Sequence, residues 1–122
     1  MLINFTNHPA ARWSEAQRMA ARQYGAVVDL PFPEVDPAAS ETSLDAIASL
    51  YVRRILAMAP GAVLCQGECT LVYRVTRLLL AQGVPVLAAC SRRQSVEQPQ
   101  PDGTTLKRSV FAFTRFRRYD TP

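Results

Sequence analysis

The sequence predicts a small α/β domain in three layers, with a mostly parallel sheet, helices on both faces and an antiparallel last strand. Three observations predict this fold. Short apolar segments alternate three times with amphipathic segments, as in repeated strand–helix units. Polar turns separate each of these apolar segments from the helix that follows. The last two apolar segments are joined by a turn instead of a helix, which favours antiparallel pairing. We expect residues 1–122 to form one Rossmann-like domain, because 122 residues suit a single core.

The elements can be placed from periodicity and from the residues that start and stop helices. Ser14 and Gln17 have the spacing of a capping box, and Gly25 is a typical helix end. Thr42 with Asp45 is a second candidate cap. The expected order is strand 2–5, helix 15–24, strand 26–30, helix 43–58, strand 62–65, helix 70–82, strand 84–90 and strand 106–119.

The loop after the first strand is the first candidate binding element. Thr6, Asn7 and His8 follow the apolar start of the chain directly, so they lie at a strand's carboxyl end. Ligands of open α/β sheets bind at that edge. Trp13, just before the first helix, either covers the helix end or stacks on a base. Gln17 either completes the cap or contacts a ligand.

Two further loops reach the same edge if the strands are parallel. Phe32 stands in the proline-rich loop after the second strand. Gln66, Gly67 and Glu68 link the third strand to the helix that begins near Thr70. Gly67 lets the backbone bend and lets a ligand approach the amides. Glu68 is either a carboxylate favoured by the helix dipole or a reactive group.

The fourth strand is expected to end in Ser91, Arg92 and Arg93, which then leave the sheet together. One hydroxyl and two guanidinium groups suit phosphate, although a solvated loop start is the competing interpretation. Residues 94–104 are polar and predict an exposed turn. In the last strand, phenylalanine and arginine residues are interleaved. That pattern suits stacked bases and phosphates, or an edge strand protected by charge.

The composition limits the partners. The net charge is +4 and 13 of the 14 basic residues are arginines, so an anionic partner fits. Cys65, Cys69 and Cys90 are odd in number and poorly spaced for zinc, which predicts small core thiols in a reducing cytoplasm. No apolar run approaches the roughly 20 residues that span a bilayer, and the start does not look like a signal peptide. We expect a cytoplasmic protein without a membrane partner.

Several short motifs resemble those of small stand-alone CRISPR-associated proteins, single-domain relatives of the CARF (CRISPR-associated Rossmann fold) sensors. The motifs are Asn4-Phe5-Thr6-Asn7-His8-Pro9 with Trp13-Ser14-Glu15-Ala16-Gln17, then Gln66-Gly67-Glu68, and finally Phe113-Thr114-Arg115-Phe116-Arg117. The resemblance covers nearly the whole chain in order and length. It implies a CARF-like fold and a homodimer that binds a cyclic oligoadenylate, the second messenger of type III CRISPR defence, across its two-fold axis. Cyclic tetra-adenylate is the first candidate.

The resemblance also implies a chemistry without a metal or cofactor. In the ring nucleases a ribose 2′-hydroxyl attacks the adjacent phosphodiester and leaves a 2′,3′-cyclic phosphate. By position, the first loop and the Ser91–Arg92–Arg93 loop would hold the phosphates. His8 would protonate the leaving oxygen, since an unperturbed imidazole pKa of ~6.5 suits proton transfer near neutral pH. His8, Arg92 and Glu68 are the candidate catalytic residues.

Three other functions remain open at this point. The first is a non-catalytic binder that sequesters the same ligand. The second is a nucleotide- or nucleoside-processing enzyme with Glu68 as nucleophile or base. The third is a nucleic-acid-binding module, which we do not expect for duplexes because the arginines are spread along the chain. Rings of other sizes and an assembly larger than a dimer are further alternatives.

Overall fold

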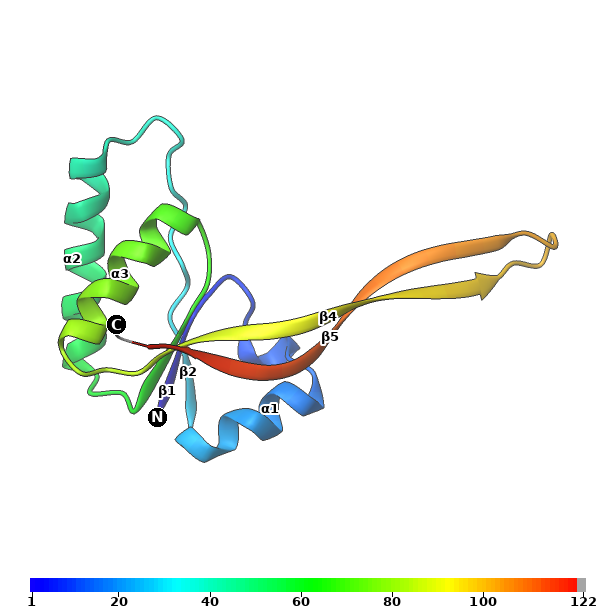
Figure 1. Cartoon of the computed structure of the whole chain (residues 1–122), viewed down its shortest axis with the longest axis horizontal. Coiled ribbons are helices and arrows are strands. Elements are labelled where there is room, and N and C mark those ends of the chain that lie inside the picture. Colours follow the sequence, from blue (N-terminus) through cyan, green and yellow to red (C-terminus); the bar gives the residue numbers. More distant parts are fainter. Residues whose placement is uncertain (121–122) are drawn as a thin grey trace.

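The computed structural model describes residues 1–120 and contains one five-stranded sheet in the order β2-β1-β3-β4-β5. The strands are β1 (Leu2–Phe5), β2 (Val27–Asp29), β3 (Ala62–Cys65), β4 (Val86–Pro99) and β5 (Thr105–Tyr119). The helices are α1 (Glu15–Ala21), α2 (Glu41–Ala57) and α3 (Cys69–Ala81), with short 3-10 turns at Ala10–Arg12 and Arg22–Tyr24. Strands β1 to β4 are parallel and β5 is antiparallel to β4. The predicted fold class is therefore confirmed (Figure 1).

The sheet is covered on both faces, which gives the three layers. Alternate residues of a strand point to opposite faces. Ile3 and Phe5 pack with α2 and α3, whereas Leu2 packs with Leu64 and Trp13 on the side of α1. All four residues of β1 and all four of β3 are buried, as expected for central parallel strands.

The helix ends agree with the sequence at α1 and differ at α2. Ser14 Oγ accepts a hydrogen bond from Gln17 N at 3.2 Å, and Gly25 follows the helix with a φ of 89°. Helix α2 begins two residues earlier than predicted. Its cap is Ser40, whose Oγ accepts from Ser43 N at 3.1 Å, while Thr42 lies inside the first turn. Ser40 has the extended backbone conformation that an N-cap residue takes, with φ −78° and ψ 161°, whereas Thr42 is already helical.

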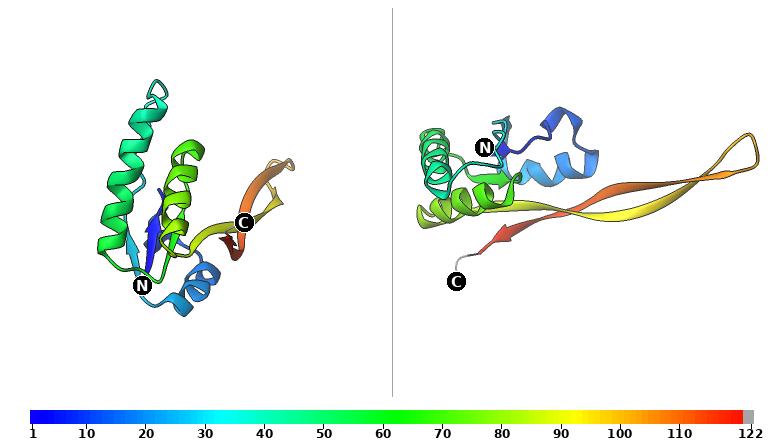
Figure 2. Two further views of the ribbon diagram at one scale, coloured as in Figure 1. Left: turned by 60° about the vertical axis from the view of Figure 1, so that its left-hand side comes forward. Right: turned by 90° about the horizontal axis from the view of Figure 1, so that it is seen from above.

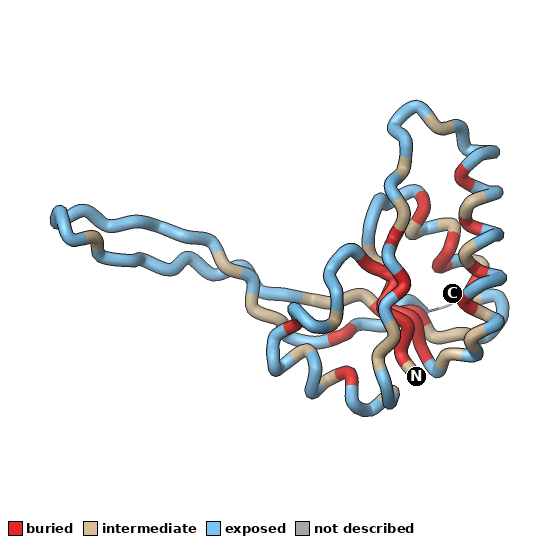
Figure 3. Tube along the Cα trace, turned by 180° about the vertical axis from the view of Figure 1, so that it is seen from behind, coloured by how far each residue is buried: buried red, intermediate tan, exposed pale blue. Residues whose placement is uncertain are grey.

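The largest difference from the prediction is the length of β4. This strand continues to Pro99 instead of ending at Cys90, so most of the predicted turn 94–104 is strand. Residues 91–114 form a two-stranded ribbon, which we call the arm. The arm projects from the rest of the molecule (Figures 1 and 2). We call that rest, residues 1–90 and 115–120, the body. Nearly every residue of the arm is exposed (Figure 3). A ribbon that is solvated on both faces has no apolar alternation for sequence analysis to detect.

A bulge marks the base of the arm. Cys90 pairs with Arg115 and Ser91 pairs with Phe113, so β5 contains one extra residue, Thr114. Bulges bend a strand and increase its twist. The bulge therefore lies where the ribbon leaves the covered part of the sheet.

None of the helices within residues 1–120 is both long and apolar enough to cross a bilayer.

Candidate functional site

A cleft of about 460 Å³ opens at the carboxyl edge of the parallel strands, on the α1 side of the sheet. The residues that line it and that matter here are Thr6, His8, Trp13, Gln66, Ser91 and Phe111. They come from the loop after β1, the end of β3 and the base of the arm. The first five were predicted as ligand-binding residues, and the structure brings these five together.

A hydrogen-bond network holds the first loop in one conformation. Asn4 is buried in β1, and its side-chain nitrogen donates to His8 O and to Asp29 Oδ1, both at 2.8 Å. Thr6 Oγ1 donates to Asn4 Oδ1 at 2.8 Å and accepts from His8 N at 3.0 Å. Trp13 Nε1 donates to His8 O at 3.1 Å. A buried polar network that is satisfied in this way rigidifies a site, so the His8 side chain is presented from a fixed backbone.

Trp13 covers the loop instead of standing free for stacking. Only 5% of its surface is exposed, and its ring lies 6.2 Å from that of Phe116. Trp13 also lines the cleft. Asn7 is exposed in the same loop, outside the cleft lining.

The arm supplies the opposite wall and separates the two predicted arginines. Phe111 is 72% exposed and lines the cleft together with Ser91. Arg93 pairs directly with Phe111 across the ribbon, so both side chains share one face. The guanidinium of Arg93 donates to Ser109 Oγ at 3.0 and 3.2 Å. Arg92 precedes Arg93 in the same strand and lies on the opposite face, away from the cleft.

The end of β3 joins the cleft to the sheet. Gln66 Oε1 accepts from Ala89 N at 3.1 Å and so ties the end of β3 to β4. Gly67 lies against Phe32, and a Cβ at Gly67 would come within 2.4 Å of that ring. Phe32 is buried, with its ring 4.8 Å from that of Phe5. Phe32 and Gly67 therefore pack against each other on the α2 and α3 side, and neither lines the cleft.

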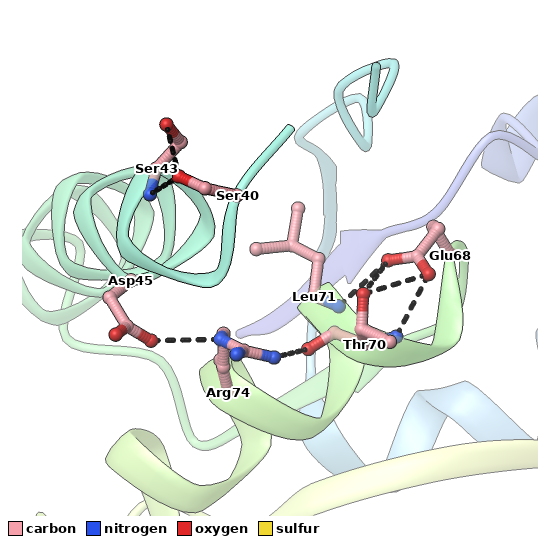
Figure 4. Close-up of polar contacts among 7 residues, drawn as sticks. All are labelled: Ser40, Ser43, Asp45, Glu68, Thr70, Leu71 and Arg74. Atoms are coloured by element: carbon pink, nitrogen blue, oxygen red, sulfur yellow. Dashed lines mark hydrogen bonds and ion pairs between the residues drawn. The ribbon is translucent and has the colours of Figure 1, made fainter. Parts of the chain in front are cut away.

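Glu68 is the N-cap of α3, in a second region of the molecule. Its carboxylate accepts from Thr70 N at 3.1 Å, Leu71 N at 2.9 Å and Thr70 Oγ1 at 2.6 Å (Figure 4). The hydroxyl of Thr70, with the amides of Leu71 and Thr70, lowers the pKa of Glu68 below its ordinary range. Glu68 and Thr70 line a hollow of about 410 Å³ between the starts of α2 and α3. In this hollow, Arg74 Nε donates to Asp45 Oδ1 at 2.8 Å. Glu68 and Thr70 are thus separated from His8.

A larger groove of about 690 Å³ runs along α3 on the other face of the sheet. Cys65 and Cys69 line it. Burial raises the pKa of the Cys65 thiol to about 12, which keeps it protonated. The prediction of three core thiols is wrong, because Cys69 is exposed and Cys90 is only partly buried. Among residues 1–120, no group of three or more His, Cys, Asp or Glu side chains is placed to hold a metal ion.

The sequence missed the residues that position the site. Asn4 and Asp29 hold the first loop, and the available signal was an asparagine inside the apolar run of β1. Phe111 belongs to the interleaved phenylalanine and arginine residues of the last strand, but that pattern does not place it at the cleft. Its position at the cleft depends on the register with Arg93, which pairing across a turn determines.

The cleft offers a specific set of groups to a ligand. It has one imidazole, the hydroxyl of Ser91 and an exposed aromatic ring, and the guanidinium of Arg93 lies on the same face of the arm as that ring. An exposed ring beside hydroxyl, imidazole and guanidinium groups suits a nucleotide, whose base stacks and whose phosphate accepts hydrogen bonds.

Comparison with known proteins places the chain in a family. No curated protein and no solved structure matches it. The model of a family described as Uncharacterized protein MJ1673 family matches residues 1–117. Because this match spans nearly the whole chain, the chain belongs to the Uncharacterized protein MJ1673 family.

Proposed function

We propose that the protein binds a cyclic oligoadenylate, with cyclic tetra-adenylate as the first candidate, and thereby lowers the concentration of this signal in type III CRISPR defence. The observation that carries the proposal is the convergence of Thr6, His8, Gln66 and Ser91 on one cleft. The resemblance of the opening loop and of the turn after β3 to CRISPR-associated CARF-like proteins supports the choice of ligand.

Each group of the cleft has a role in this proposal. An adenine stacks on Phe111, and the phosphate that follows it contacts Arg93 and the hydroxyl of Ser91. A cleft of about 460 Å³ is the size of one small-ligand site, so a ring of four nucleotides needs more than one copy. We therefore propose a homodimer with the ring across its two-fold axis.

Cleavage of the ring is the catalytic form of the proposal. The 2′-hydroxyl oxygen bonds to the phosphorus, the bond from phosphorus to the 5′ oxygen breaks, and a 2′,3′-cyclic phosphate forms. The His8 imidazolium gives its proton to the leaving 5′ oxygen, and the hydroxyl proton passes to water. The fixed backbone of the first loop supports this role, because it limits the positions that the imidazole can take.

The non-catalytic form of the proposal is favoured by a different observation. His8 is the only titratable side chain among the residues that line the cleft, all of which the structure describes. No second acid or base in that lining is placed to accept the proton of the 2′-hydroxyl. Glu68, the candidate for another enzyme class, already uses its carboxylate to cap α3. Slow cleavage or simple sequestration is therefore the expected behaviour.

Binding and product analysis of cyclic tetra-adenylate, without added metal, test the proposal. We expect two chains for each ring by calorimetry. Arg93→Ala should weaken binding by about 10- to 100-fold, because charge-assisted hydrogen bonds contribute about 1.5–3 kcal/mol. Arg92→Ala is the matched control on the opposite face and should have a much smaller effect.

The products separate the two forms. Linear products with 2′,3′-cyclic phosphate ends that disappear in His8→Ala establish ring cleavage. Intact ligand after hours of tight binding establishes sequestration. Absence of binding to cyclic tetra-adenylate and to rings of other sizes overturns the proposal. In that case Glu68→Gln becomes the next variant to measure. If the protein is a nucleotide-processing enzyme with Glu68 as nucleophile or base, this variant should lose turnover and retain substrate binding.

A further inference from the structure

The net charge of the molecule is concentrated on one hairpin. Strands β4 and β5 with their turn, residues 86–119, contain seven basic and two acidic residues, a net charge of +5. The other residues carry seven basic and eight acidic groups, a net charge of −1, and the two values add to the total of +4. The arginines are spread along the sequence, but their positive charge is therefore unevenly distributed in space.

Four of these arginines share one face of the ribbon. Arg92 pairs with Ala112 and Arg108 with Val96, while Arg115 and Arg117 pair with Cys90 and Ala88. Directly opposed residues of an antiparallel pair lie on the same face. Ala89 and Ser91 line the cleft, so positions 88, 90, 92 and 96 of β4 point to the other face. We call the set Arg92, Arg108, Arg115 and Arg117 the arginine face.

Nothing acidic interrupts the arginine face within residues 86–119. Glu97 pairs with Lys107 and lies on the cleft face of the ribbon. Asp102 is in the turn, where its Oδ1 accepts from Thr104 N at 3.0 Å and from Thr104 Oγ1 at 2.6 Å. All four arginines are exposed. A row of guanidinium groups without carboxylates is a surface for a polyanion.

The shape of the ribbon selects among polyanions. From Ser91 to Pro99 the arm has nine residues, or about 30 Å at ~3.3 Å for each residue, close to one turn of B-form DNA at ~34 Å. The major groove of B-form DNA is about 12 Å wide and admits a two-stranded β-ribbon. The major groove of A-form RNA is too narrow and deep for this.

We propose that the hairpin of β4 and β5 is a binding element for double-stranded DNA, with the arginine face against the phosphate backbone along one groove. The contacts are to phosphates, so the binding is independent of base sequence. This site is separate from the cleft, because Phe111 and Arg93 lie on the opposite face of the same ribbon. The inference does not depend on the proposed binding of cyclic oligoadenylate.

The test is binding of the full-length protein to a fluorescein-labelled DNA duplex of about two turns, roughly 21 base pairs. Fluorescence anisotropy is measured between roughly 50 and 200 mM NaCl. Four phosphate contacts predict a slope of log Kobs against log salt of about −3.6, at ~0.9 for each phosphate. Arg108→Ala/Arg117→Ala should reduce this slope to about −1.8 and weaken binding at low salt.

The matched control removes the same charge from parts of the body outside β4 and β5. Arg22→Ala/Arg53→Ala changes one exposed arginine of the 3-10 turn after α1 and one of α2, and should leave the slope near −3.6. An equal loss in both double variants would show that only net charge matters and would overturn the proposal. Absence of binding at low salt, or binding of single strands or RNA duplexes as tight as that of DNA, would overturn it as well. A failure here leaves the cyclic tetra-adenylate measurements unaffected.

Discussion

Phe5 and Phe111 belong to strands of the same sheet, but the first is completely buried and the second is 72% exposed. Phe5 lies in the body, between Phe32 and Tyr51 at ring distances of 4.8 and 5.1 Å. Phe111 lies in the arm, where it forms the outer wall of the cleft. The comparison shows that one sheet contains a region determined by packing and a region whose side chains are left exposed to solvent.

The arm depends on the body for its order. An isolated two-stranded hairpin is only marginally stable in water. Here both strands of the arm continue into the covered sheet, where Leu87 and Phe116 are part of the core. Substitutions of buried residues in the body should therefore change global stability, while substitutions in the arm should leave it nearly unchanged.

The strongest test of this comparison is the same substitution in both regions. Phe5→Ala should lower the free energy of unfolding by about 3–5 kcal/mol, because it removes a fully buried aromatic ring. Phe111→Ala should change it by about 0.5 kcal/mol or less, as surface substitutions do. Urea unfolding followed by circular dichroism measures both. A large loss of unfolding free energy for Phe111→Ala would contradict this, because it would mean that the Phe111 ring is packed against another surface in solution.

A smaller loss of stability is expected in the body where the backbone of Gly67 lies against the ring of Phe32. Gly67→Ala should destabilise the protein by about 1–3 kcal/mol, because the new Cβ overlaps the ring of Phe32. Gly61→Ala is the control, since a Cβ there has its nearest neighbour, Met1 O, at 3.6 Å. Equal unfolding curves for the two variants would contradict the close packing of Gly67 on Phe32.

Serine provides a third comparison between the regions. Ser40→Ala removes the hydroxyl that caps α2 and should cost about 1 kcal/mol. Ser95→Ala, in the arm opposite Ser109, should cost about 0.5 kcal/mol or less. Thermal melts of both variants under one set of conditions decide the comparison, and a cost at Ser95 that equals the cost at Ser40 would contradict it.

The smallest expected effect is a dependence on pH. Thr70 and the nearby amides lower the pKa of Glu68, and Thr104 lowers the pKa of Asp102 in the same way. Depressed folded-state pKa values contribute stability above the ordinary carboxyl pKa, and this stability is lost as the pH falls through the folded values. Glu68→Ala should therefore lower Tm at neutral pH, with the difference from wild type shrinking in acid. Asp102→Ala should lower Tm less than Glu68→Ala does, because the bonds from Asp102 to Thr104 lie in the exposed turn of the arm, away from the core.

The sequence predicted the body well because its signals are local. Ser14 and Gly25 mark the ends of the first helical segment, and the apolar run of residues 62–65 is β3 as observed. The candidate site was predicted in part, because the carboxyl ends of parallel strands meet at one edge. Thr6, His8 and Gln66 are there for that reason.

The arm and the details of the site could not be predicted in this way. The extension of β4 from Cys90 to Pro99 depends on hydrogen bonds to residues that follow a turn, while its own side chains show no alternation. Whether Arg92 or Arg93 faces the cleft depends on strand register, which the identity of neighbouring residues does not determine. The burial of Phe32 depends on the missing Cβ of Gly67, a contact between distant segments.

The ribbon also has a consequence for how such proteins can diverge in length. Insertion of one residue in each strand beyond the bulge lengthens the arm by about 3.3 Å and exchanges the two faces of every position between the insertions and the tip. Insertion of two residues in each strand lengthens it by about 6.6 Å and restores the original faces. Relatives that keep both the cleft face and the arginine face should therefore differ in arm length by an even number of residues in each strand.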